Sequence, residues 1–264
     1  MGARDLFPVI VLITGFLLAT STWAGDGVLE INQTCAKETG CFPGDTPGYP
    51  VTITGAAGRS YRLTSDLGVS GQNTTAIEIA ARDTTIDLAG FRITCTSFTP
   101  PSTLQPCSEA GPGTGAGIVV DDESTSTGVE VGNGSIFGMP GDGVVLGRRG
   151  VLRDLRVSEN GGDGIRTGSS SIVSGNNVFE NGSTEITASA YCLISGNTVF
   201  SAMGTGISAD DGSLIERNSV TILAGTALSL SGGAGYRGNS LRAFTSARFG
   251  VNLGGNLCVD VVCP

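Results

Sequence analysis

The sequence contains no histidine, only one lysine and only one tryptophan. Histidine supplies most acid–base catalysis near neutral pH, and it completes serine and cysteine triads and many zinc sites. Its absence excludes those chemistries. Basic residues are also few, because 15 Lys and Arg stand against 24 Asp and Glu, for a net charge of -9 at pH 7. Nucleic-acid binding needs a basic footprint, so no nucleic-acid partner is expected.

Glycine is abundant, with 42 residues among 264, and proline adds 10. Their combined share stays below the level that is typical of low-complexity disorder. Hydrophobic residues make up 39% of the chain, which is enough to bury a core. We therefore expect a folded protein that is rich in turns.

Residues 1–24 have the pattern of a secretory signal peptide. Arg4 precedes an apolar stretch over Phe7–Ala19, and Thr22-Trp23-Ala24 offers small residues at the cleavage positions. The stretch is shorter than the roughly 20 apolar residues of a membrane span. We expect cleavage near Ala24 and a mature chain, with no membrane span, that is secreted, periplasmic or at the cell surface. An uncleaved anchor is the alternative.

Six of the seven cysteines fall in three close pairs. In an oxidising compartment each close pair is expected to form a local disulfide. None of the pairs has the CxxC spacing of a zinc or redox motif. The seventh cysteine, Cys192, is expected to be a small buried thiol. The predicted disulfides are Cys35–Cys41, Cys95–Cys107 and Cys258–Cys263.

The strongest pattern in the sequence is a repeat of 21 residues. Three columns of apolar residues keep this step, and a fourth column contains only asparagine. The first column holds Ile136, Val157, Val178, Val199, Val220 and Leu241. The second holds Val131, Leu152, Val173, Ile194, Ile215 and Tyr236, and the third holds Val144, Ile165, Ile186, Ile207 and Leu228. The asparagines are Asn176, Asn197, Asn218 and Asn239.

Within each repeat, short runs alternate apolar and polar residues between Gly, Asn, Ser and Asp, which is typical of strands joined by turns. Stacked repeats place each residue beside its counterpart one repeat later, about 4.8 Å away. The predicted fold is all-β: a parallel β-helix, right-handed by the crossover rule, with 21-residue coils and disulfide-stapled ends. A leucine-rich repeat is the alternative, because Leu152–Asn160 fits its consensus once.

The repeat also sets the expected domain boundaries. Ile86–Ile93 matches Val129–Ile136 position for position, and the longer connection that follows Ile93 indicates an inserted loop with its own disulfide. The exposed ends of a solenoid invite aggregation, so capping segments are expected there. The predicted parts are an N-terminal cap at 25–50, the β-helix at 51–255 with the inserted loop at 94–117, and a C-terminal cap at 256–264.

Residues 51–255 resemble the right-handed parallel β-helix, or pectin-lyase-like, superfamily. The resemblance is carried by Tyr61–Leu67, Thr85–Gly90, Val131–Ile136 and the 21-residue coils. It implies a fold rather than an activity, because the superfamily includes polysaccharide lyases, glycoside hydrolases, epimerases and exported proteins of no assigned activity. Similarity to polygalacturonases or alginate epimerases requires motifs with histidine, which this sequence lacks. Pectate-lyase-like chemistry stays open, because that branch uses carboxylate-bound Ca²⁺ and an arginine base.

Asp142 and Asp163 are the candidate metal ligands for such chemistry. They lie one repeat apart in Gly-Asp-Gly contexts, so their carboxylates are expected near 5 Å from each other. A pair of like charges raises a pKa or holds a hard cation such as Ca²⁺. Arg166 follows Asp163 as the candidate catalytic base. The alternative is that both aspartates accept backbone hydrogen bonds in turns. Apart from Ca²⁺, no cofactor is expected.

Five arginines concentrate positive charge in one part of this acidic chain. They are suited to an acidic sugar. The alternative is that Arg148 and Arg149 form ion pairs with Asp122 and Glu123, one coil earlier. The arginines are Arg148, Arg149, Arg153, Arg156 and Arg166. The asparagine column is expected to be an internal structural ladder. The sequence thus favours an exported, non-catalytic surface, matrix or glycan-contacting module. A Ca²⁺-dependent lyase acting on an acidic polysaccharide is the alternative.

Overall fold

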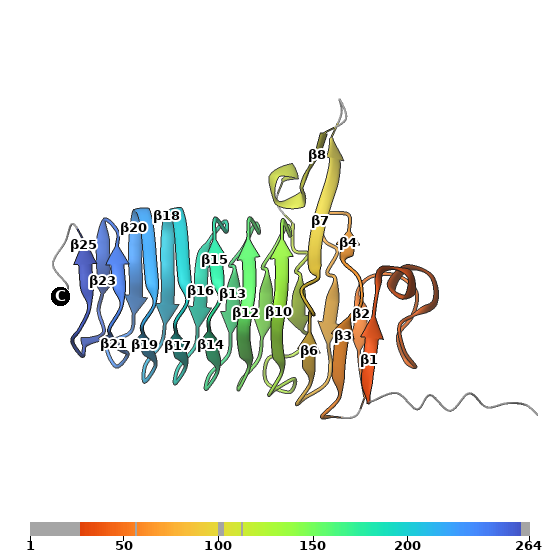
Figure 1. The fold of residues 1–264 in the computed structure, drawn as a ribbon, viewed down its shortest axis with the longest axis horizontal. Helices are drawn as coiled ribbons and strands as arrows, with labels where there is room; N and C mark the ends of the chain where they lie inside the picture. The colour runs from red at the N-terminus through yellow and green to blue at the C-terminus, as the bar shows by residue number, and fades with distance from the viewer. Residues whose placement is uncertain (1–26, 56, 100–102, 112, 260–264) are drawn as a thin grey trace, which may run out of the picture.

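The computed structural model describes residues 27–55, 57–99, 103–111 and 113–259. The predicted signal peptide lies outside these residues. Short strands wind into coils that stack along one axis, from β1 at one end to β25 at the other (Figure 1). The predicted parallel β-helix is confirmed. Among the described residues, no helix is both long and apolar enough to cross a membrane.

The coils build three parallel sheets, here called faces A, B and C. Face A contains β1 (Val28–Ile31), β3 (Ser60–Leu63), β6 (Thr85–Asp87), the first halves of β10 (Glu130–Phe137) and β12 (Val151–Ser158), β14 (Ile172–Ser174), β17 (Leu193–Ser195), β19 (Leu214–Glu216), β21 (Gly235–Arg237) and β24 (Val251–Asn252).

Face B contains β4 (Leu67–Val69), β7 (Arg92–Thr99), the second halves of β10 and β12, β15 (Asn177–Phe179), the first parts of β18 (Thr198–Ala209) and β20 (Ser219–Leu230), β22 (Ser240–Arg242) and β25 (Leu257–Val259). Face C contains β2 (Val51–Ile53), β5 (Ile77–Ile79), β9 (Ile118–Val120), β11 (Val144–Leu146), β13 (Ile165–Thr167), β16 (Thr184–Ala188), the last parts of β18 and β20, and β23 (Thr245–Arg248).

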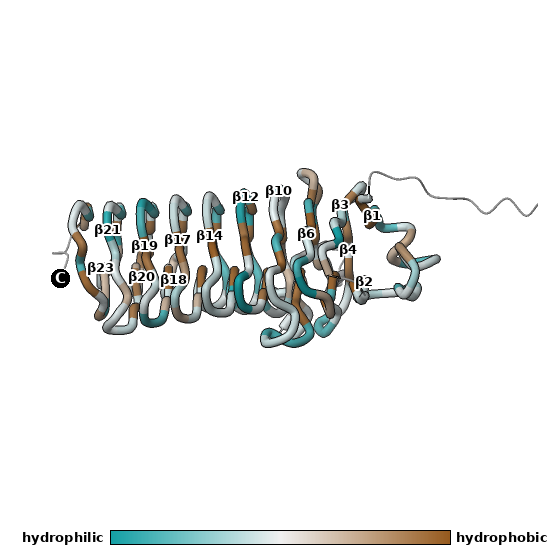
Figure 2. The backbone as a smooth tube through the Cα atoms, turned by 90° about the horizontal axis from the view of Figure 1, so that it is seen from below, coloured by the Kyte–Doolittle hydropathy of each residue, from teal (hydrophilic) through white to brown (hydrophobic). Residues whose placement is uncertain are grey.

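The core consists of columns of apolar side chains that point into the solenoid. Val157 pairs with Val178, and Val178 pairs with Val199, as the 21-residue step predicts. These residues are buried, as are Tyr61 and Tyr236 in the neighbouring column on face A. Figure 2 shows the result, with hydrophobic and hydrophilic segments alternating around each coil. Because each coil covers the core of the next, stability comes from the array.

Asparagine side chains fill the corner between faces A and B. The Asn197 Oδ1 accepts hydrogen bonds from the backbone N–H and the Nδ2 of Asn176, both at 3.0 Å. Its own Nδ2 donates to the carbonyl of Val173 at 2.9 Å. The same pattern passes to Asn218, Asn239 and Asn256. The ladder therefore satisfies buried polar groups that the turn would otherwise leave unpaired.

The upstream coils pair in a different register from the one predicted. Ile93 pairs with Ile136 as expected, but Ile86 pairs with Val131 rather than with Val129. The turn between β6 and β7 is longer than the matching turn inside β10, and the Leu88 N–H bonds to the Gly132 carbonyl. The ungapped sequence match failed because residues 88–91 form this longer turn, whereas the match placed them in strands.

The inserted loop is a hairpin that projects from the side of the solenoid (Figure 1). β7 runs on beyond face B and pairs antiparallel with β8 (Thr103–Pro106), which leads into the short helix η2 (Cys107–Ala110). The Cys95–Cys107 disulfide joins the base of this hairpin. Its buried cysteines anchor the projection to the core.

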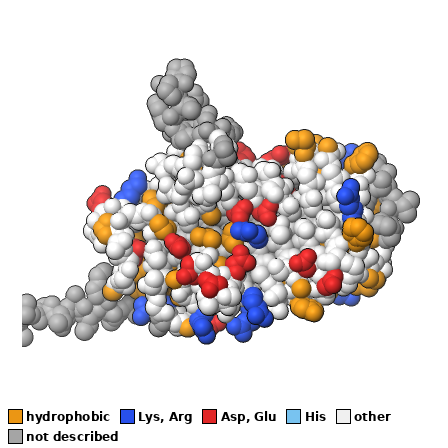
Figure 3. All heavy atoms as spheres, turned by 180° about the vertical axis from the view of Figure 1, so that it is seen from behind, with side chains coloured by type: hydrophobic (Ala, Val, Ile, Leu, Met, Phe, Trp, Pro, Cys, Tyr) orange, Lys and Arg blue, Asp and Glu red, His pale blue; other side chains and the backbone are white. Residues whose placement is uncertain are grey.

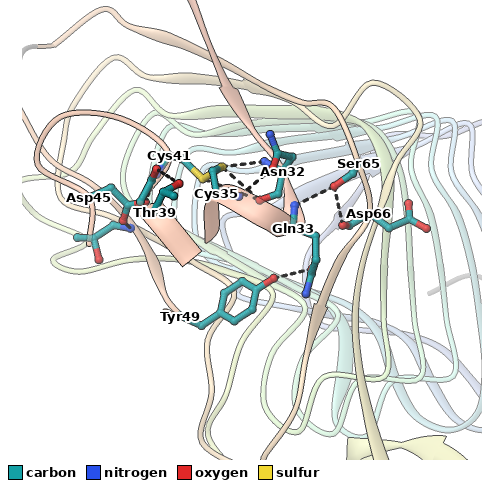
Figure 4. Close-up of a disulfide and its surroundings, with 11 residues drawn as sticks. Asn32, Gln33, Cys35, Thr39, Cys41, Asp45, Tyr49, Ser65 and Asp66 are labelled. Carbon is teal, nitrogen blue, oxygen red and sulfur yellow. Dashed lines mark hydrogen bonds between the residues drawn. A yellow bond between two sulfur atoms is a disulfide. The ribbon is translucent and has the colours of Figure 1, made fainter. Parts of the chain in front are cut away.

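The N-terminal cap is tied to the first coils around the Cys35–Cys41 disulfide (Figure 4). Cys35 begins the π-helical turn η1 (Cys35–Thr39), and the Cys41 N–H donates to the Asp45 carboxylate at 2.8 Å. Parallel pairing already starts at β1, before the predicted boundary at residue 51, and β25 continues it past residue 255. Cys258 is disulfide-bonded; its predicted partner, Cys263, lies outside the described residues.

Candidate functional site

The structure brings Asp142, Asp163 and Arg166 together at the corner between faces B and C. The Asp142 Oδ1 accepts the backbone N–H of Asp163 at 2.8 Å, and the Asp163 Oδ1 accepts that of Thr184 at 3.0 Å. The Asp142 Oδ2 forms an ion pair with the Arg166 guanidinium at 3.0 Å. The carboxylates thus link successive coils, in the way that the asparagines do at the neighbouring corner.

These contacts suit a structural role better than a metal site. Ca²⁺ takes six to eight oxygen ligands, and two carboxylates supply too few. Within the part of the chain that the structure describes, no three His, Cys, Asp or Glu side chains lie close enough to share a metal. The Arg166 guanidinium is held by a carboxylate, and this contact competes with any role as a base.

The five arginines do not form one patch. Arg153 lies on face A, Arg156 on face B and Arg166 on face C, while Arg148 and Arg149 lie at the corner between faces C and A. They span about one coil of sequence, so the chain distributes them around the solenoid. Seen from behind, acidic and basic side chains lie close together over the middle coils (Figure 3).

The predicted ion pairs of Arg148 and Arg149 with Asp122 and Glu123 are wrong for the described residues, in which neither arginine has a carboxylate within 4.0 Å. Asp122 is occupied within its own loop, where its Oδ1 accepts the N–H and the hydroxyl of Ser124 at 2.8 and 2.6 Å. These hydrogen bonds lower the pKa of Asp122, and the bond from the Ser124 hydroxyl has the largest effect.

Face A carries charge that is largely compensated. The Arg153 Nε donates to the Glu130 Oε1 at 2.7 Å, and Arg62 pairs with Asp87 at 3.5 Å. A hollow of about 350 Å³ lies beside these pairs, above Gly132. Exposed ion pairs of this kind contribute about 0–1 kcal/mol each. We read this hollow as a solvated charged surface.

Face B carries a column of phenylalanines on its outer side. Phe137, Phe179 and Phe200 occupy the same position in their coils, with Ser158 between the first two. Adjacent coils lie about 4.8 Å apart, so the rings follow the solenoid axis over four successive coils. The next outward column is polar, with Ser135, Arg156, Asn177, Thr198 and Ser219.

Two arginines accompany this column. The Arg156 guanidinium lies over the Phe179 ring, with its carbon 4.9 Å from the ring centroid, a geometry that is typical of a cation–π contact. At the N-terminal end of the column a hollow of about 270 Å³ is lined by Arg92, Ser135, Phe137, Arg156, Ser158 and Glu159. Face B therefore combines aromatic, cationic and hydroxyl groups on one outward surface.

The phenylalanine column is not among the features predicted from the sequence. The signal is present in the 21-residue register, where Phe179 and Phe200 are adjacent members and Phe137 lies two steps earlier. Ser158 interrupts it. Of the tyrosines, Tyr236 is in the core, whereas Tyr191 is largely exposed.

Comparison with known proteins agrees with the architecture. A model of the right-handed β-helix region matches residues 114–256. The chain belongs to this family of right-handed β-helix proteins. No match was found among curated proteins.

Two solved structures were found in the comparison with known folds. The Dettilon tailspike protein superposes with a TM-score of 0.49 and 13% identity, over 79% of this chain and 52% of the tailspike chain. The chain thus spans about half the length of that protein. The A-module of the mannuronan C-5 epimerase AlgE4 from Azotobacter vinelandii gives a TM-score of 0.23 and 12% identity, over 88% of this chain and 87% of the module.

Proposed function

We propose that the protein is an exported, non-catalytic glycan-contacting module that binds an extended polysaccharide along face B. The observation that carries this proposal is the column of Phe137, Phe179 and Phe200, in register on the outer side of a rigid sheet. Phe200 is 37% exposed, so its ring presents an apolar surface to solvent.

The chemistry of the column suits a sugar chain. Aromatic rings supply rigid apolar area against the C–H faces of sugars, and a few well-placed polar groups fix orientation. Asn177 and Thr198 lie in the neighbouring outward column and offer those polar groups. Because the rings repeat along the solenoid axis, they favour a ligand that itself repeats, lying along the coils.

Binding is favoured over cleavage by what the candidate catalytic groups already contact. Asp142 and Arg166 are engaged with each other, and Asp163 accepts a backbone N–H. The disulfides Cys35–Cys41 and Cys95–Cys107 are consistent with an oxidising compartment outside the cytoplasm, which supports the proposed export.

The test is affinity electrophoresis through gels that contain single polysaccharides, both neutral and acidic. We expect at least one polysaccharide to retard the protein, and Phe179→Ala to weaken that retention by roughly two- to tenfold, the effect of losing one aromatic contact. Phe244→Ala is the matched control, because Phe244 is 83% exposed but lies in the turn before β23.

Any of three results would overturn the proposal. The first is equal weakening by Phe179→Ala and Phe244→Ala, and the second is no retention by any polysaccharide of the panel. The third is the release of unsaturated sugars from a uronate polymer incubated with the protein and Ca²⁺, because that product defines a lyase.

A further inference from the structure

A third hollow, of about 350 Å³, lies away from face B at the corner between faces C and A. Four successive coils contribute to it: Arg82 follows β5, Thr125 follows β9, Arg148 and Arg149 follow β11, and Ser170 follows β13. The connection between β9 and β10 covers residues 121–129, whereas the next coil needs only residues 147–150. The longer connection forms one wall of the hollow.

Three arginines line this hollow: Arg82, Arg148 and Arg149. In the described part of the chain, none of Arg82, Arg148 and Arg149 has a carboxylate within 4.0 Å. Five other arginines do have such a partner, namely Arg62, Arg153, Arg166, Arg217 and Arg237. In a chain with a net charge of -9, three arginines that line one hollow with no carboxylate partner within 4.0 Å in the described part of the chain favour a negative ligand there.

Two of the nearby acidic residues, Asp121 and Asp122, form hydrogen bonds within their own loop. The Asp121 carboxylate accepts the Ser126 hydroxyl at 2.7 Å, and the Asp122 carboxylate accepts the Ser124 hydroxyl. One arginine is positioned by the wall itself, because the Arg149 Nη2 donates to the Thr127 Oγ1 at 2.9 Å. The loop therefore holds one guanidinium in place, and leaves its other N–H groups free for a ligand.

We propose that this corner hollow binds the oxyanion of an acidic sugar, a sulfate ester or a uronate carboxylate. Planar guanidinium groups recognise such oxyanions through paired N–H···O bonds. The site uses residues from separate coils, and it does not depend on the phenylalanines of face B. It therefore goes beyond the proposed face B function, and it adds a preference for charged polysaccharides.

The experiment measures retardation in gels that contain dextran sulfate, polygalacturonate or uncharged dextran. We expect a charged polymer to retard the protein more than uncharged dextran does, and Arg148→Gln and Arg82→Gln each to weaken that retention at least fivefold. Retention by dextran sulfate would identify sulfate esters as the ligand class of the hollow, and retention by polygalacturonate would identify uronate carboxylates. Arg248→Gln is the matched control, because it removes the same charge from an exposed position on β23.

The site is overturned if Arg248→Gln weakens retention as much as Arg148→Gln does, because binding then follows total charge. It is also overturned if Arg82→Gln leaves retention unchanged, or if neither charged polymer retards the wild-type protein. Phe179→Ala separates the two proposals, since it is expected to leave the fivefold effect of Arg148→Gln intact. Equal thermal melting of the variants shows that each one folds.

Discussion

The carboxylate of Glu185 accepts two hydrogen bonds from Asn181, one from its Nδ2 at 2.6 Å and one from its backbone N–H at 3.1 Å. Asn181 continues a short ladder from Asn160 at the corner between faces B and C. One coil later the matching position holds Ala202. Glu185 therefore supplies the acceptor that a further asparagine would have provided. Its side chain is fully buried, and burial raises its pKa to about 7.

This buried carboxyl makes stability depend on pH. The folded state holds the proton of Glu185 more tightly than the unfolded state, in which the pKa is 4.5. The contribution of protonated Glu185 to the free energy of unfolding is therefore fully present below about pH 4.5 and is lost as the pH rises through 7. At 1.36 kcal/mol per pKa unit, the loss is about 3 kcal/mol.

Glu185→Gln removes that titration. We expect the unfolding free energy of the variant, relative to wild type, to rise by about 3 kcal/mol between pH 4.5 and pH 8. Chemical denaturation at several pH values measures it. Glu159→Gln, which removes an exposed carboxyl elsewhere on the coils, is the control. Parallel pH dependences for wild type and Glu185→Gln would show that the carboxyl does not titrate in this range.

The asparagine ladder is expected to contribute strongly to stability. Asn197→Ala removes the acceptor of both the Asn176 N–H and the Asn176 Nδ2, which are buried and have no access to water. An orphaned buried donor costs about 1–3 kcal/mol, so we expect a loss of roughly 2–4 kcal/mol. Asn177→Ala, on the exposed side of β15, is expected to change stability by less than about 0.5 kcal/mol. Similar melting temperatures for the two variants would contradict the ladder.

Calcium is expected to leave thermal stability unchanged. A ligand that binds only the folded state at a hundredfold excess over its Kd adds about 2.7 kcal/mol. Asp142 and Asp163 already accept backbone hydrogen bonds, and they supply too few oxygens for such a site. The measurement is a melting curve with Ca²⁺ and with a chelator. A Ca²⁺-dependent rise that Asp163→Asn abolishes would restore the lyase hypothesis.

The fold was predictable because a solenoid repeats its constraints. Residues such as Val157 and Val178 must face the same core in every coil, so their identity recurs with the coil length. The asparagine column was predictable for the same reason. Glu185 was not, because it lies among glycines, with Gly164 one coil before and Gly206 one coil after. Glu185 fills a local gap in the ladder, and it is not part of any column that repeats every 21 residues.

The surface sites resisted prediction for a different reason. Three arginines that are close in sequence lie on three different faces, because the chain turns a corner between them: Arg153 is on face A, Arg156 on face B and Arg166 on face C. Conversely, Arg82 and Arg148 are distant in sequence and line one hollow. On a β-helix, neighbours on the surface are separated by whole coils. Loop lengths that vary between coils, as between β9 and β10, decide which side chains meet.

The central claim, that face B holds the polysaccharide, is tested most directly by hydroxyl-radical footprinting of the phenylalanines with and without a retained polysaccharide. The account predicts that oxidation of Phe179 and Phe200 falls when the ligand is bound. Oxidation of Phe244 and Phe249, which are 83% and 77% exposed and lie off the column, is predicted to stay the same. Unchanged oxidation at Phe179 and Phe200, with protection at Phe244 or Phe249 instead, would contradict the account.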